Sequence, residues 1–133
     1  MKTLEEYIKM YEKHTKEKFM FKQPFSFFYH PEHGFCEYHA EGDTLYIWQM
    51  CGDLDYWIKI GLKTCHQFRL THMASFVVRK PLPFIRALGF KVEQTENKGG
   101  EKRYTCRNSK KETLIVTQTA DRHTFVWEVD LNV

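Results

Sequence analysis

The sequence lacks the features that mark membrane-spanning, secreted and zinc-knuckle proteins. No apolar run in its 133 residues reaches the length that crosses a bilayer, and the start of the chain has no signal-peptide core. The four cysteines are scattered and form no CxxC pair, so we expect reduced thiols in the core. These absences predict a soluble, cytoplasmic protein with no membrane partner.

An excess of charge of one sign is missing as well. The net charge is only +3 and basic residues are interleaved with acidic ones, so nucleic acid is not favoured as a partner. The chain also has no internal repeat, low-complexity tract or obvious linker. With 42% hydrophobic and 16% aromatic residues, it is expected to fold as one domain over residues 1–133.

The strongest pattern that is present lies in residues 44–90. Residues 44–51 are apolar at nearly every position, which is typical of a strand buried on both faces. Apolar residues then recur at helical spacing over 54–70, a second buried strand follows at 71–79, and 81–88 indicates another helix. This order predicts two parallel strands joined by a crossover helix.

The flanking segments predict a further helix and antiparallel strands. Thr3 and Glu6 have the spacing of a capping box, which starts a helix. Further strands are expected at 25–30, 35–39, 90–95, 102–107, 113–119 and 124–131. The predicted class is α/β with a mixed, α+β-type sheet: antiparallel strands lead into a central parallel pair, and 113–131 adds a C-terminal hairpin.

Two stretches resemble the GNAT acetyltransferase superfamily. Residues 79–90, Arg-Lys-Pro-Leu-Pro-Phe-Ile-Arg-Ala-Leu-Gly-Phe, look like the fourth helix of that fold, which typically ends in Leu/Tyr-Gly-Phe. Residues 51–57, Cys-Gly-Asp-Leu-Asp-Tyr-Trp, are similar to GNAT-like proteins of phages and prophages. The element order agrees over about 1–107, and the terminal hairpin lies outside the part that the family shares.

The resemblance implies a GNAT-like fold that binds acetyl-CoA between its two central parallel strands, which splay apart at their carboxyl ends. The pyrophosphate would lie on backbone N–H groups at the start of the crossover helix. The implied cofactor-binding residues are Met50, Cys51, Gly52, Asp53, Leu54 and Arg79. The chain departs from the family in two places: only Gly52 remains of the glycine-rich loop, and Ile85 stands where many members have a general-acid tyrosine.

The implied function is acetyl-CoA-dependent N-acetyl transfer to the amine of a small molecule or a protein. Glu37 is the best candidate for a catalytic base, although its position also fits an outward-facing strand residue. The alternative is a catalytically inactive GNAT-like fold that serves as a phage- or prophage-type interaction protein. In either case a homodimer could form through an edge strand of the C-terminal hairpin.

Other residue types leave alternatives open. A zinc site could be built from His30, His33, Cys36 and His39, although no cysteine-pair knuckle supports it. Cleft-lining aromatics could be Tyr46, Trp48 and Tyr56, which equally fit a core. Cys51 as a nucleophile would need a partner base, and the neighbouring sequence suggests none, so a buried thiol fits better.

Overall fold

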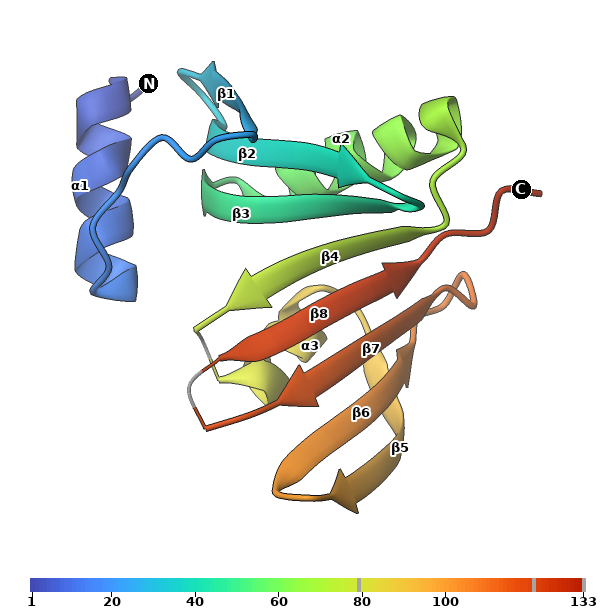
Figure 1. The fold of residues 1–133 in the computed structure, drawn as a ribbon. Helices are drawn as coiled ribbons and strands as arrows, with labels where there is room; N and C mark the ends of the chain where they lie inside the picture. The colour runs from blue at the N-terminus through green and yellow to red at the C-terminus, as the bar shows by residue number, and fades with distance from the viewer. Residues whose placement is uncertain (79, 121, 133) are drawn as a thin grey trace.

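The computed structural model describes residues 1–78, 80–120 and 122–132, and these form one eight-stranded sheet with three helices (Figure 1). The helices are α1 (Leu4–Thr15), α2 (Leu54–Phe68) and α3 (Pro81–Ala87). The strands are β1 (Ser26–His30), β2 (Gly34–Glu41), β3 (Thr44–Gly52), β4 (His72–Val77), β5 (Lys91–Lys98), β6 (Glu101–Arg107), β7 (Thr113–Gln118) and β8 (His123–Glu128). The predicted mixed α/β class is confirmed.

The sheet is mostly antiparallel. Its strand order is β1-β2-β3-β4-β8-β7-β6-β5, and β3 with β4 is the one parallel pair among the described strands. This pair and the intervening α2 confirm the strand–helix–strand unit predicted for residues 44–79. None of the helices in the described ranges is long and apolar enough to cross a membrane.

The helix α1 begins at the predicted capping box. The Glu6 amide donates to Thr3 Oγ1 at 3.2 Å, and the Thr3 amide donates to Glu6 Oε1 at 3.0 Å, so two of the amides at the helix start are satisfied. The buried face of α1 then packs with β2 and β3 in a small apolar cluster built on Tyr7, Tyr11 and Phe35. α1 therefore covers the end of these two strands.

The helices α2 and α3 build the main core on the opposite face. Phe35 packs with α1 while its neighbour Cys36 belongs to the cluster under α2, and adjacent residues of a strand point to opposite faces. Figure 1 shows α2 behind β2 and β3, and α3 behind β8. The largest fully buried side chains of this main cluster are Ile47, Met73, Ile85, Leu114, Val116 and Phe125.

A β-bulge interrupts β3 in its middle. Between the residues that pair with Tyr38 and Cys36 of β2, β3 has one residue more than its partner. Trp48 and Gln49 therefore stand together opposite Glu37, and the local twist of the strand increases. As a result, both side chains lie on the face that α1 covers: Trp48 lines a cavity beside α1, and Gln49 binds the connector that follows α1.

The parallel strands separate soon after they pair. Their register runs from Thr44 opposite His72 to Ile47 opposite Ser75 and ends there. β3 continues beside β2 to Gly52, whereas the rest of β4 stays beside β8. Figure 1 shows the two strands close together where they pair and diverging toward α1.

The C-terminal hairpin occupies the middle of the sheet. β8 lies between β4 and β7, and β7 lies between β8 and β6, so both strands are paired on both sides. The expectation that this hairpin offers an edge strand for a homodimer is wrong, because the edges are β1 and β5. Phe125 and Trp127 explain the placement, since they point into the main core and are almost fully buried.

Candidate functional site

A cavity of about 220 Å³ lies where β3 and β4 diverge. Its wall is formed by the end of α1, the second half of β3, the end of β4, Phe84 of α3 and Arg122 of the β7–β8 turn. It stands at the carboxyl ends of the parallel strands, the place where open α/β sheets bind ligands. This makes it the leading candidate for a binding site.

The structure brings most of the predicted cofactor residues to this cavity. Met50, Cys51, Gly52 and Leu54 line it, as the implied site requires. Asp53 does not line it, and its side chain is used elsewhere. Arg79 lies outside the described residues.

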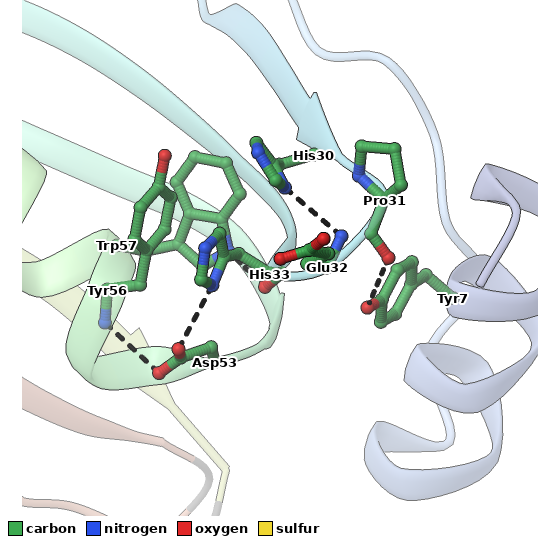
Figure 2. A network of polar contacts seen from close by, with 8 residues as sticks. All are labelled: Tyr7, His30, Pro31, Glu32, His33, Asp53, Tyr56 and Trp57. Carbon is green, nitrogen blue, oxygen red and sulfur yellow. Dashed lines mark hydrogen bonds and ion pairs between the residues drawn. The ribbon is translucent and has the colours of Figure 1, made fainter. Parts of the chain in front are cut away.

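Asp53 holds the start of α2 (Figure 2). Its Oδ1 accepts the Tyr56 amide at 3.2 Å, which is the usual N-cap bond, and its Oδ2 accepts from His33 Nδ1 at 3.1 Å. The Asp53 amide itself donates to the His33 carbonyl at 2.8 Å. A carboxylate therefore already occupies the positive end of this helix, where an anionic ligand would have to compete with it.

The β1–β2 turn is locked against the start of α2. The His33 ring stacks on Tyr56 with centroids 3.7 Å apart, and the His33 carbonyl also accepts from Trp57 Nε1 at 2.7 Å. Gly34 and Gly52 pair directly and both have φ near +101°. A Cβ atom on Gly34 would lie 1.9 Å from the carbonyl oxygen of Cys51, so only glycine permits this approach.

The same turn contacts α1 from its other side. Tyr7 Oη donates to the Pro31 carbonyl at 3.1 Å, and His30 Nδ1 accepts the Glu32 amide at 3.1 Å (Figure 2). The two histidines of this turn lie together, with ring centroids 4.6 Å apart. The zinc set suggested by the sequence does not assemble, because Cys36 points into the main core. Within the described ranges no three metal-binding side chains come together.

Trp48 is half-buried in the cavity wall, and two cationic side chains lie over its ring. Lys22 Nζ lies 3.9 Å from the centre of the Trp48 ring, and the Arg122 guanidinium carbon lies 5.5 Å from it. Phe76, another wall residue, meets the same ring edge-on at 6.0 Å. Arg122 is also paired with Glu17 Oε1 at 3.8 Å. Trp48 lies in the cavity wall and in neither apolar cluster, whereas Tyr46 and Tyr56 are not in this wall and Tyr56 packs against the main core.

Glu37 is fully buried and does not line the cavity. Its carboxylate accepts the Lys22 amide at 3.3 Å and the side-chain amide of Gln49. Gln49 in turn donates to the Met20 carbonyl at 2.6 Å and accepts the Met20 amide at 3.3 Å. The interpretation of Glu37 as an outward-facing residue is wrong: it and Gln49 fasten the α1–β1 connector to the sheet.

Some cavity residues carry no signal in the sequence. His14 and Glu17 come from the end of α1, and Arg122 comes from the far end of the chain. No local motif links them, because only the pairing of β8 with β4 brings the β7–β8 turn to this place. Tyr11 also lines the cavity, and its burial raises the pKa of its hydroxyl to about 12, so it stays protonated at neutral pH.

Compared with known proteins, the chain matches no protein-family model and no curated protein sequence.

Proposed function

We propose that this chain is a GNAT-like protein whose cavity between β3 and β4 binds acetyl-CoA for transfer of the acetyl group to an amine. The divergence of the two parallel strands after Ile47 and Ser75 carries the proposal. Beyond this point the outer backbone edge of β3 faces the cavity instead of a strand. Its N–H and C=O groups can pair with the amides of a pantetheine arm, which is an extended chain with peptide-like groups.

The composition of the wall supports the same ligand. Met50, Phe76 and Phe84 offer apolar surface to the methylene groups of pantetheine, and Leu54 leads to the first turn of α2. The pyrophosphate would then meet the amides at that helix start, as the resemblance implies. Arg122 adds a positive charge to the wall.

Transfer in this site would depend mainly on positioning. The amine nitrogen attacks the thioester carbonyl carbon, the C–N bond forms, the C–S bond breaks, and the CoA thiolate leaves and takes up a proton. Backbone N–H groups at the parted strand can stabilise the charge that develops on the carbonyl oxygen. Glu37 is enclosed by Gln49 and Lys22, so its part in this scheme is to hold the connector, and the proton of the amine passes to water or to Glu17.

The second candidate function is a GNAT-like fold of phage or prophage type that binds a partner without catalysis. The position of Asp53 favours it, because this carboxylate caps α2 and is held there by His33. At ~4 Å a like-charge pair costs roughly 1 kcal/mol even in water, so Asp53 opposes a pyrophosphate at that helix start.

Calorimetric titration with acetyl-CoA, and with CoA for comparison, separates the two candidates. If the first candidate, the acetyltransferase, is right, acetyl-CoA should bind with a micromolar dissociation constant, which corresponds to a binding free energy of about −8 kcal/mol. Val78→Trp should abolish the heat because Val78 lines the cavity, whereas Val92→Trp on β5 should leave it unchanged. Both valines are exposed to similar extents, 41% and 37%, so the two variants match in kind. No heat from a folded wild-type chain would exclude the transferase and leave the second candidate.

A further inference from the structure

We infer that Lys22 is a self-acylation site, at which the amine of this chain takes the acyl group from a thioester bound in the cavity. The inference rests on the proposed function and goes beyond it by naming an acceptor. Three observations support it: the backbone of Lys22 is fixed by buried side chains, its ammonium lies against Trp48 of the cavity wall, and no carboxylate of the described residues pairs with that ammonium.

The backbone at Lys22 is held by hydrogen bonds to buried side chains. The β3 bulge brings Gln49 to the connector, where its side-chain amide binds both the carbonyl and the amide of Met20. Two residues later the Lys22 amide donates to Glu37, which is itself completely buried. A buried carboxylate and a buried carboxamide thus fix where the Lys22 side chain starts, which reduces the conformational freedom lost on reaching a target.

The Lys22 ammonium rests on the ring of Trp48, although Lys22 itself is not among the lining residues. Its Nζ is 3.9 Å from the ring centre of Trp48, and Trp48 lines the cavity beside the parted strand edge. A cation–π contact at an exposed site is a weak restraint, about 0.5–1 kcal/mol, so the amine can leave the ring for a thioester carbonyl nearby. Arg122 approaches the same ring, with its guanidinium carbon 5.5 Å from the ring centre.

The neighbouring acid does not neutralise Lys22. Glu17, which lines the cavity, pairs with Arg122 at 3.8 Å, and within the described ranges no ion pair involves Lys22. Lys22 is also exposed, so its ammonium can lose a proton to water before it reacts. Its nitrogen then attacks the carbonyl carbon of the thioester, the C–S bond breaks, and the released thiolate takes up a proton. The product is an N-acetyl-lysine amide and free CoA.

Site-resolved mass spectrometry tests the inference. The full chain is incubated with acetyl-CoA, digested, and the rate of acetylation is measured at Lys22, at Lys18 of the same connector and at Lys59 of α2. We expect Lys22 to react at least about tenfold faster than either, because proximity favours an intramolecular acceptor. The rate should not depend on protein concentration, and unfolding in urea should remove the preference.

Variants distinguish a positioned lysine from a merely reactive one. Trp48→Leu should slow acetylation of Lys22 by about two- to fivefold, in line with the weak contact it removes, and leave Lys59 unchanged, and Lys22→Arg should remove the main single-acetyl adduct from the intact mass. Lys18→Arg is the matched control and should leave that adduct in place. Equal rates at the three lysines in a folded chain that binds acetyl-CoA by calorimetry would overturn the inference alone. Absence of binding would overturn the proposed function and the inference with it.

Discussion

The two halves of β3 differ in what lies beside them, although both are rich in apolar residues. Thr44–Ile47 have β2 on one side and β4 on the other, while 48–52 have only β2 and face the cavity on the open side. The bulge at Trp48 and Gln49 is the point at which one half changes into the other. An apolar run thus predicts burial but not the partner: the first half of β3 packs in the core, whereas the second half borders a cavity.

The largest effect is expected where the open half of β3, residues 48–52, ends beside the β1–β2 turn. Gly34→Ala should destabilise the fold by about 3–5 kcal/mol, because the new Cβ would collide with the Cys51 carbonyl at a residue that already has a positive φ. Urea unfolding followed by circular dichroism measures the loss. Gly42→Ala at the β2–β3 turn is the control: its φ is also positive, but nothing lies within 4 Å of the added Cβ, so about 1 kcal/mol is expected. Equal losses would contradict the close approach of Gly34 and Gly52.

Truncating one side chain in each half of β3 measures separately what the two halves contribute to stability and to binding. Ile47→Ala should cost about 3 kcal/mol, because Ile47 is 1% exposed within the main core. Met50→Ala should cost only about 1 kcal/mol, since its side chain is half-buried in the cavity wall. The affinity for acetyl-CoA, measured by calorimetry on the folded proteins, should change for Met50→Ala and not for Ile47→Ala. If Ile47→Ala changed the affinity and Met50→Ala did not, the ligand would lie at the first half of β3, and the proposed binding site would be wrong.

The buried thiols of the main core should make the stability of the protein depend on pH. Burial raises the pKa of Cys36 to about 12 and those of Cys65 and Cys106 to about 11, above the ordinary value of 9.0. The unfolded chain therefore loses these protons first, so their contribution to stability is complete below pH 9.0 and is lost progressively as the pH rises through about 11 for Cys65 and Cys106 and about 12 for Cys36. Urea midpoints measured from pH 7 upward should fall in this window. Cys106→Ala should reduce the slope; an unchanged slope would show that this thiol does not cause it.

The smallest expected effect concerns the charge at the start of α2. Asp53→Asn keeps a side-chain acceptor for the Tyr56 amide but removes the charge that opposes a pyrophosphate. Acetyl-CoA should bind about fivefold more tightly, which corresponds to roughly 1 kcal/mol. Stability should fall by less than ~1 kcal/mol, because the pair with His33 is partly exposed. Asp43→Asn, the same change at the other end of β3, should leave the affinity unaltered, and a tightening there would point to net charge as the cause.

Local patterns in the sequence were enough to predict most of the elements. The capping box of Thr3, the helical spacing over 54–70 and the two strands around it depend on neighbours a few residues apart, and each is present. The predicted burial of β3 on both faces was not correct, because every second residue of this strand is only half-buried. Boundaries shifted by a few residues: β5 extends to Lys98, and β8 already ends at Glu128. These differences arise because strand ends depend on the length of the partner strand.

Features that depend on distant partners were not predictable in this way. The bulge becomes visible only when β3 is aligned with β2, and it alone explains why Gln49 sits inside an apolar strand and why Glu37 is buried. Likewise, Arg122 reaches the cavity only because β8 pairs with β4. The resemblance implied Asp53 along with Met50, Cys51, Gly52 and Leu54, and the structure places the other four, but not Asp53, in the cavity wall, because the strand–helix junction is itself a local feature.

The central position of β8 also affects how the protein can be made. During synthesis β4 emerges well before β8, so one edge of β4 stays without its partner while α3 and three further strands are produced. Native pairing of the sheet then waits for a contact between distant parts of the chain, which makes folding slow and leaves an unpaired strand edge open to other chains. A ribosome-bound chain that ends before His123 should therefore aggregate or recruit a chaperone, although most of its elements are already present.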